Sequence, residues 1–352
     1  MIRKLSIRQL SEEKEESLSP YAVKSKQSQG RLKYEEPCPI RPVFQRDRDR
    51  IIHSKAFRRL KHKTQVFIAP MGDHYVTRLT HTLEVSQVAR TIARALNLNE
   101  DLTEAIALGH DLGHTPFGHV GEDVLNELYH QGFRHNEQSL RVVDYLENDG
   151  QGLNLTFEVR DGILNHSKSR GAMMGEGWGK VATLEGEIVK ISDIIAYVNH
   201  DIGDAIRAGI ITERGLPLSA IKILGISHSQ RINTMVSDII DSSWTTRGCD
   251  KISMDKPTIN MSSQVLEATN NLREFLFERV YNVNSAQEEA ERARETICLL
   301  YNYLQENKSG LPPEYRAYSD DTERKVVDYI AGMTDQYALR LVEELSLKSK
   351  AE

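Results

Sequence analysis

Histidine and carboxylate side chains are concentrated in one stretch of the sequence, from Asp101 to Glu122. In its first half Leu102, Ile106 and His110 recur every fourth residue, which predicts a helix with His110 on its apolar stripe. Glycines and Pro116 then break the helix and lead into a turn. The polar set of this stretch is His110, Asp111, His114, His119 and Glu122. Imidazoles and carboxylates held on a rigid helix and a kinked turn are typical of a metal-dependent hydrolytic site, whereas a single histidine would more simply be structural.

Two other predicted helices carry partners for this stretch. Upstream, residues 77–96 place a histidine on an otherwise apolar stripe, which consists of His81, Val85, Val88, Ile92 and Leu96. Downstream, residues 185–208 place polar groups on one face, namely Asp193, Tyr197, His200, Asp201 and Asp204. A polar helix face is usually only solvated, but Tyr and His among Asp residues favour a ligand-lined cleft.

These motifs in this order resemble the deoxyguanosinetriphosphate triphosphohydrolase family of HD-domain phosphohydrolases. The resemblance runs from about residue 15 to 210 and has a weaker echo at Asp328–Asp335. It is carried by residues 44–60, 63–67, 78–81, 110–122, 133–140, 152–156 and 192–197. One departure is Val76, which stands where the family usually has the first Arg of Arg-Thr-Arg-Leu-Thr-His. The resemblance implies an all-α fold, an HD-domain helical bundle with additional C-terminal helices.

The resemblance also implies the metal ligands, because the H…HD…D pattern of the family falls on His81, His110, Asp111 and Asp193. Two imidazoles and two carboxylates favour a hard or borderline divalent ion, Mn²⁺ or Mg²⁺ first and Fe²⁺ or Co²⁺ as alternatives, over a closed structural zinc site. Such an ion keeps positions for a water and a phosphate oxygen, and it lowers the pKa of the bound water.

The implied reaction is attack of water on the α-phosphorus of a deoxynucleoside triphosphate, which releases deoxynucleoside and tripolyphosphate. By the same resemblance His135 donates the proton to the leaving group, and His119 and Glu122 orient it and handle the water, with His114 as a further catalytic candidate. The residues expected at the substrate are Arg78 and Arg59 at phosphate, Tyr197 and Asp201 at phosphate and the sugar 3′-hydroxyl, and Gln65 and Val66 at the sugar.

Two other functions stay open at this point. One is a different HD-domain nucleotide phosphohydrolase or phosphodiesterase, although the Gly-Tyr-Pro motif usual in cyclic dinucleotide enzymes is absent. The other is a non-catalytic nucleotide sensor or nucleic-acid-binding protein. The formal net charge of −6 gives no global basic footprint for nucleic acid, so that partner is only weakly supported.

The composition bounds the remaining possibilities. A chain of 352 residues can bury a large core, and 39% hydrophobic with 27% charged residues is ordinary for a soluble globular protein. Three cysteines without metal-type spacing argue against a disulfide framework. No apolar run is long enough to span a membrane, and no leader is apparent, so we expect a cytoplasmic protein.

Three regions are predicted along the chain. Residues 1–43 form an N-terminal arm, partly disordered, that begins with a short helix and could wrap a neighbouring subunit. Residues 44–210 form the HD-domain catalytic core. Residues 211–352 form a C-terminal helical region packed on the core, with long amphipathic helices at 262–307 and 321–347 that could build a homo-oligomer interface. A possible allosteric dNTP is a further expected partner.

Two segments have alternative interpretations. Residues 46–63 form a basic helix that is either a solvated face or a cradle for a polyanion such as substrate phosphate. Residues 167–186 are rich in glycine and are either disordered or a lid over the substrate.

Overall fold

The computed structural model of the protein describes residues 6–65, 75–167, 180–248, 257–281, 284–316 and 321–349. Within these ranges the regular structure is helical, and extended backbone pairs only at two isolated bridges, Arg31 with Thr156 and Thr64 with Thr77. The predicted all-α fold is therefore confirmed. No described helix is long and apolar enough to cross a membrane.

Packing separates the chain into two compact units, each assembled from three stretches. The first unit comprises Met1–Ile52, Thr82–His110 and Asn154–Tyr281, and the second comprises His53–His81, Asp111–Leu153 and Asn282–Glu352. Each unit is thus defined by its packing and combines stretches that are separated in the sequence. The division predicted at residues 43 and 210 stays a prediction.

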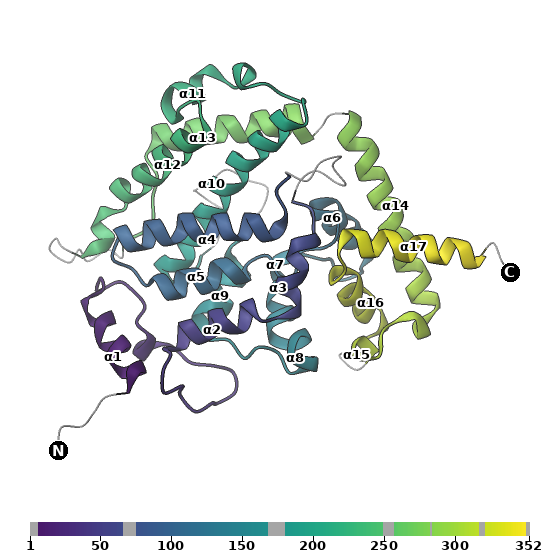
Figure 1. Cartoon of the computed structure of the whole chain (residues 1–352), viewed down its shortest axis with the longest axis horizontal. Helices are drawn as coiled ribbons and strands as arrows, with labels where there is room; N and C mark the ends of the chain where they lie inside the picture. The colour runs from purple at the N-terminus through teal and green to yellow at the C-terminus, as the bar shows by residue number, and fades with distance from the viewer. Residues whose placement is uncertain are drawn as a thin grey trace. The chain divides into compact units, whose positions relative to one another are not determined.

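The first unit is built around α5, which packs against α2, α9 and α10, while α10 also packs against α12 and α13 (Figure 1). Its apolar residues are buried as the periodicity predicts, and Val85 and Ile92 on α4 and Leu96 directly after it have no exposed surface. The helices are α1 (Ile7–Lys14), α2 (Val43–Ile52), α4 (Arg78–Ala95, from Thr82 onward), α5 (Glu100–Gly109), α9 (Phe157–Asn165), α10 (Leu184–Arg207), α11 (Leu218–Leu224), α12 (His228–Ser242) and α13 (Ser263–Leu276).

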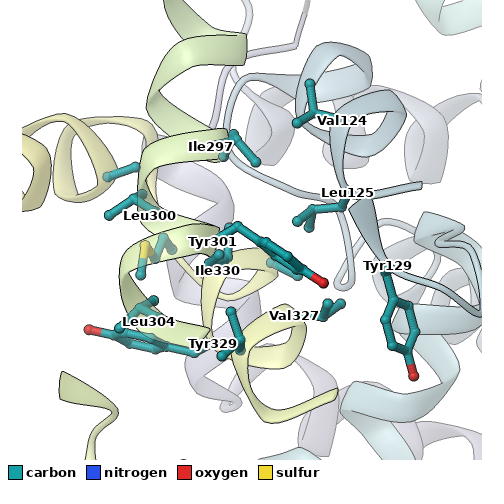
Figure 2. Close-up of a cluster of buried hydrophobic side chains, with 14 of the residues drawn as sticks. Val124, Leu125, Tyr129, Ile297, Leu300, Tyr301, Leu304, Val327, Tyr329 and Ile330 are labelled. Atoms are coloured by element: carbon teal, nitrogen blue, oxygen red, sulfur yellow. The ribbon is translucent and has the colours of Figure 1, made fainter. Parts of the chain in front are cut away.

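The second unit packs α14 against α6, α16 and α17. Figure 2 shows its core, in which Leu125 of α6, Ile297 of α14 and Ile330 of α16 are completely buried. The helices of this unit are α3 (Lys55–Arg59), α6 (Gly118–Leu128), α7 (His135–Arg141), α8 (Glu147–Gly150), α14 (Asn284–Glu306), α15 (Pro313–Arg316), α16 (Thr322–Ala331) and α17 (Asp335–Ser349).

Short turns of other helix types connect these elements. Two are π-helical, η4 (Val142–Leu146) and η7 (Phe277–Tyr281). The others are single 3₁₀ turns, η1 (Glu15–Ser17), η2 (Ser25–Gln27), η3 (Leu60–His62), η5 (Glu213–Gly215), η6 (Trp244–Arg247) and η8 (Lys308–Gly310).

The two long C-terminal helices of the sequence prediction are each divided. The first ends as α13 and continues through the π-turn η7 before α14 begins. The second stops at Ala331 and restarts at Asp335, because Gly332, Met333 and Thr334 form a turn. Amphipathic periodicity continues through both interruptions, so it does not reveal them.

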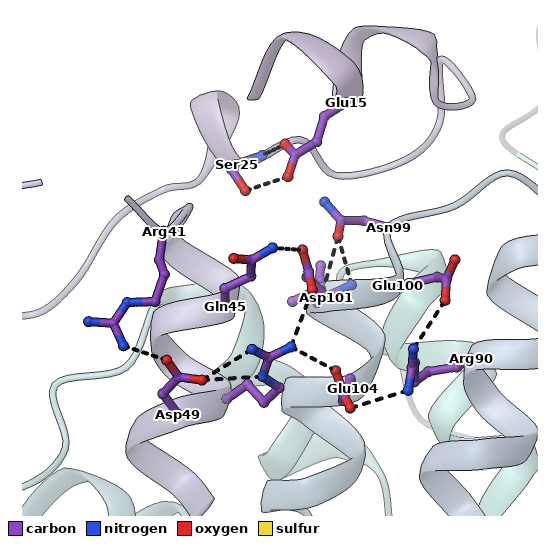
Figure 3. Close-up of polar contacts among 12 residues, drawn as sticks. Glu15, Ser25, Arg41, Gln45, Asp49, Arg90, Asn99, Glu100, Asp101 and Glu104 are labelled. Carbon is purple, nitrogen blue, oxygen red and sulfur yellow. Dashed lines mark hydrogen bonds and ion pairs between the residues drawn. The ribbon is translucent and has the colours of Figure 1, made fainter. Parts of the chain in front are cut away.

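Most arginines of the basic segment contact acidic side chains. In the first unit Arg48 contacts Glu104 at 3.1 Å. Arg41, which precedes the segment, contacts Asp49 within it at 2.5 Å (Figure 3). Arg46 and Arg50 both pair with Glu35. These pairs favour a structural role for the first half of the segment over a cradle for phosphate.

Candidate functional site

The helix–turn–helix predicted around the polar stretch is present. Asn99 caps the start of α5 by accepting hydrogen bonds from the backbone N–H groups of Asp101 and Leu102. The helix ends at Gly109, and α6 begins at Gly118. The intervening turn carries the HD dipeptide and His114.

In the second unit Asp111 lies between a cation and an imidazole. Arg78 Nη1 donates to Asp111 Oδ2 at 2.6 Å, and His81 Nε2 lies 3.9 Å from the same oxygen. All three side chains are almost completely buried. The Nε and Nη2 groups of Arg78 have no hydrogen-bond partner among the described residues. A buried guanidinium with unused donors is suited to an anionic ligand.

His114 is completely enclosed. Its ring stacks on that of His135, with centroids 4.5 Å apart and an interplanar angle of 18°, and it meets the ring of His119 edge-on at 5.2 Å. Burial and the nearby Arg78 charge hold the pKa of His114 well below its usual value. His114 is therefore neutral at physiological pH and can accept a proton or bind a cation.

His135 begins α7, as the sequence predicts, and Glu122 of α6 holds it. Both carboxylate oxygens approach His135 Nδ1, at 2.8 and 2.9 Å, and Oε1 also accepts the backbone N–H of His135 at 2.8 Å. Burial, the largest single influence, would lower the pKa of His135, but the charge of Glu122 and its hydrogen bond to the ring together outweigh burial and raise that pKa. Burial would likewise raise the pKa of Glu122, and the opposing charge of His135 with the hydrogen bond from His119 holds it far below its usual range.

His119 is the exposed member of this group. Its Nδ1 lies 3.3 Å from Glu122 Oε2, and its side chain is 72% exposed. His119, Glu122 and His135 thus form a connected set in which one carboxylate contacts two imidazoles. Such a set can orient a proton donor, which is what general acid catalysis requires.

His110 and Asp193 lie in the first unit. His110 Nδ1 donates to the carbonyl of Ala107 at 2.7 Å, which fixes the tautomer with the lone pair on Nε2, the form that binds a metal. The ring of His166 meets that of His110 edge-on at 4.9 Å. Asp193 is half-buried on α10.

The polar face predicted on α10 is packed against other side chains of the first unit. Tyr197 accepts a hydrogen bond from Arg273 Nε at 2.5 Å, and burial raises the pKa of Tyr197 to about 12. Asp201 lies 2.8 Å from His200 Nδ1 and accepts a hydrogen bond from Tyr281.

Sequence reasoning missed Arg273 and Tyr281. Each stands alone in an amphipathic segment without a motif around it. Only the packing of α13 and η7 brings them to the face of α10 that carries Tyr197 and Asp201.

The remaining predicted substrate contacts are only partly described. Gln65 is buried, and its Oε1 has no hydrogen-bond partner among the described residues. Arg59 Nη1 donates to the Tyr315 hydroxyl at 3.4 Å. Val66 and most of the glycine-rich segment predicted as a lid or disordered, residues 168–179, lie outside the described residues.

The residues of the second unit are chemically able to bind a cation. Asp111, His114 and His135 bring their nearest ligand atoms within 4.8 Å of one another, as do His114, His119 and Glu122. Neutral imidazole and carboxylate are the donors that divalent ions of the Mn²⁺ and Mg²⁺ class accept. Asp111, His114 and His135 are buried, His119 is exposed, and the donor chemistry of this cluster fits a divalent metal ion.

A polar pocket of about 370 Å³ lies beside α7. Arg134, Arg141 and Arg324 line it together with Glu137 and Asp321. None of the candidate catalytic histidines does, so the pocket is distinct from the group around His135.

Two family models match parts of the chain, and two curated proteins match it over almost its whole length. Residues 78–198 match the HD domain model, and residues 259–344 match the phosphohydrolase-associated domain model. A deoxyguanosinetriphosphate triphosphohydrolase-like protein of Caldanaerobacter subterraneus subsp. tengcongensis is 58% identical over 348 residues, 98% of this chain and 97% of that protein. A protein described in the same words, from Desulfatibacillum aliphaticivorans, is 50% identical over 95% of this chain and 96% of its own length. A crystal structure of a hypothetical protein from Aquifex aeolicus aligns over 84% of this chain and 66% of its own, with 18% identity and a TM-score of 0.44.

Proposed function

Because the chain belongs to the HD-domain family of deoxyguanosinetriphosphate triphosphohydrolase-like proteins, we propose that it is a dNTP triphosphohydrolase. It cleaves dNTPs, dGTP among them, to deoxynucleoside and tripolyphosphate. That the protein is an HD-type phosphohydrolase follows from family membership. The observation that supports the more specific dNTP triphosphohydrolase activity is His135, a buried imidazole whose pKa is raised and whose ring and backbone N–H make three contacts with Glu122.

The proposed metal ligands are His81, His110, Asp111 and Asp193. They are drawn from both units, so this set rests on the family pattern and on the donor chemistry. Mn²⁺ or Mg²⁺ is the proposed ion, and when bound it polarises the phosphoryl group and activates a water molecule. Asp111 would then share its carboxylate between the ion and Arg78, which already holds Oδ2.

Proton transfer is the part of the reaction that the second unit's own residues would perform. Cleavage between the α-phosphorus and the sugar oxygen leaves an alkoxide, which needs a proton. His135 can supply it from Nε2, since Glu122 accepts from Nδ1 and favours the protonated ring. His119 and Glu122 are proposed to orient the attacking water, and neutral His114 to support the His135 ring by stacking.

Substrate binding is proposed to use the remaining predicted residues. Arg78 offers two unused donor groups to a phosphate, and Arg59 is a second candidate. Tyr197 and Asp201 would contact phosphate and the 3′-hydroxyl, and their partners Arg273 and Tyr281 would fix their orientation. Gln65 and Val66 are proposed at the sugar.

Product analysis tests the proposal. Purified protein is incubated with each of the four dNTPs, alone and mixed, at matched Mn²⁺ and Mg²⁺, and the products are separated by ion-exchange chromatography. Tripolyphosphate with deoxynucleoside is expected. Monophosphate, pyrophosphate or orthophosphate would indicate another HD phosphohydrolase, and no turnover with any mixture would favour a nucleotide sensor. Faster turnover in mixtures than with single dNTPs would reveal the proposed allosteric nucleotide.

Assembly and location are proposed from the same resemblance. We propose a homo-oligomer located in the cytoplasm. Size-exclusion chromatography with light scattering measures the subunit number, and a fluorescent fusion reports the location. Binding to labelled single-stranded and double-stranded DNA at several salt concentrations tests the weakly supported nucleic-acid partner.

A further inference from the structure

Two buried carboxylates of the second unit lie far from the HD motif in the sequence. Asp328 is near the end of α16 and Asp335 begins α17, so both fall within residues 259–344 and outside residues 78–198. They are 1% and 8% exposed, while Ile330 and Met333 between them pack into the apolar core of this unit. Buried carboxylates without a direct chemical role need an explanation.

Asp335 holds the turn between the HD dipeptide and α6. Its Oδ1 accepts the backbone N–H of Phe117 at 3.0 Å, and its Oδ2 accepts that of Thr64 at 2.8 Å. Phe117 has a left-handed backbone, with φ of 61°, which a residue with a bulky side chain rarely adopts. Such a conformation persists only where the surroundings enforce it. Here the hydrogen bond to Asp335 holds the backbone of Phe117, which lies two residues before His119.

Lys63 links the turn before α6 to the end of α16. The completely buried Nζ donates to the carbonyl of His114 and, at 2.8 Å, to the carbonyl of Ala331. Two points of the turn are therefore attached to this C-terminal segment: His114 to the end of α16 through Lys63, and Phe117 to the start of α17 through Asp335.

Asp328 holds the helix that His135 begins. It accepts from Gln138 Nε2 at 3.0 Å and from Arg141 Nη2 at 2.6 Å, both on α7. The turn and α7 also touch directly, because Gly113 N–H donates to Ser139 Oγ at 2.9 Å, and a Cβ at Gly113 would lie 2.1 Å from the Ser139 nitrogen.

We propose that Asp335 and Asp328 are positioning residues for catalysis. Asp335 sets the turn that orients His114 and His119, and Asp328 sets the helix that orients His135. The C-terminal segment that carries both carboxylates, within the match to the phosphohydrolase-associated domain model, is thus part of the catalytic apparatus and not only a packing surface. The inference rests on the proposed function for its kinetic consequence, but its structural consequence is independent of any activity.

The test compares Asp335→Asn and Asp335→Ala with Asp321→Asn. Asp321 caps α16 in the same region by accepting from the N–H of Glu323, and Asn caps a helix equally well. An amide at 335 can accept one of the two N–H groups and opposes the other, while Ala accepts neither. Hydrogen exchange resolved at the Phe117 amide and steady-state kinetics on dNTPs are measured for the parent and all three variants.

For Asp335→Asn and Asp335→Ala we expect faster exchange at Phe117, a kcat reduced by about ten- to a hundred-fold, and a nearly unchanged KM. Asp321→Asn should behave as the parent. If the Phe117 amide of Asp335→Ala exchanges as slowly as in the parent, the proposal is overturned. Faster exchange at Phe117 together with the parent kcat would also overturn it. Uniformly faster exchange across the second unit would also overturn it, because Asp335 would then be a general stabilising residue. If the parent itself hydrolyses no dNTP, the proposed function fails, and the exchange at Phe117 still decides whether Asp335 holds the turn.

Asp328 is tested in the same way through α7. Asp328→Asn retains an acceptor for Gln138 but weakens the contact to Arg141, so we expect faster exchange in α7 and a lower kcat with the metal content unchanged. Parent exchange in α7, or a parent kcat, would contradict the role of Asp328.

Discussion

Glu122 and His135 form a two-residue unit in which one carboxylate contacts both the ring and the backbone of the histidine, with all three distances between 2.8 and 2.9 Å. The residues lie on different helices, α6 and α7, so the contact fixes the start of α7 together with the ring. The carboxylate also keeps a proton on Nδ1, and in the proposed reaction Nε2 would give its proton to the leaving group.

Replacing Glu122 by Gln should lower the pKa of His135. The carboxylate charge raises that pKa, so its removal lets burial dominate and the ring deprotonates at lower pH. If protonated His135 is the acid, the basic limb of the pH profile of kcat should move to lower pH, with a lower maximum. The matched control is Glu137→Gln, which replaces an exposed carboxylate on α7, the helix of His135, and should leave the pH profile in place. An unmoved basic limb in Glu122→Gln would assign that limb to another group.

The same pair should make stability depend on pH in two directions. The lowered pKa of Glu122 contributes stability that is present above its unfolded value of 4.5 and is lost as pH falls. The raised pKa of His135 contributes stability that is complete below its unfolded value of 6.5 and is lost as pH rises through the folded value. The pair should therefore stabilise the fold most between these two values. Denaturant unfolding of the parent and of Glu122→Gln over this range measures the difference, which should be largest between pH 4.5 and 6.5.

His135→Ala should separate binding from chemistry. We expect the variant to retain metal and to bind dNTP, while turnover falls by a factor on the order of 10²–10⁴, the usual worth of general acid–base catalysis. The comparison is His119→Ala, whose side chain is mostly exposed. Turnover of dGTP by His135→Ala at the parent rate would move the proton donor to His119.

Asp111→Asn should lose the metal with little loss of folding. The amide keeps an acceptor for Arg78, whereas Asp111→Ala would leave a buried guanidinium without its counter-ion and would confuse metal loss with unfolding. Metal content is measured by mass spectrometry of the purified protein, with the exposed Asp123→Asn as control. Full metal occupancy in Asp111→Asn would remove Asp111 from the ligand set.

The local patterns of the sequence predicted the helices and the turn of the candidate site because the relevant spacing is short. The stripe from His81 to Leu96 is buried, the helical structure is interrupted between Gly109 and Gly118, and His135 begins a helix. What could not be predicted are contacts between residues far apart in the chain. Lys63 reaches Ala331, and Asp335 reaches Thr64, across more than 260 residues, and no local periodicity encodes such a pair.

The motif from Asp328 to Asp335 illustrates the limit most clearly. Its resemblance to the family was visible in the sequence, but its role was not, since neither carboxylate stands near a histidine in the chain. Arg273 and Tyr281 are a second case, because their partners Tyr197 and Asp201 were predicted as site residues without them.

The choice of sugar is the prediction that decides between a deoxynucleotide enzyme and a general nucleotidase. Gln65 is buried with an Oε1 that has no donor among the described residues, so a sugar hydroxyl could satisfy it. A branched apolar Val66 beside C2′ would oppose a hydroxyl there by crowding it and burying it unpaired. Because an apolar pocket alone rejects an added hydroxyl by only about 10²-fold, we expect dGTP to exceed GTP in kcat/KM by roughly ten-fold or more.

Variants at both positions test how the sugar is gripped. Val66→Ala should narrow the gap between dGTP and GTP more than it lowers dGTP turnover, because it relieves crowding at C2′. Gln65→Ala should instead lower kcat/KM for both nucleotides by similar factors, since both carry the 3′-hydroxyl that it would bind. The measurement is a paired steady-state assay on the two nucleotides at matched Mn²⁺. Equal kcat/KM values for dGTP and GTP in the parent protein would refute the proposed exclusion of the 2′-hydroxyl and favour a broader HD nucleotidase.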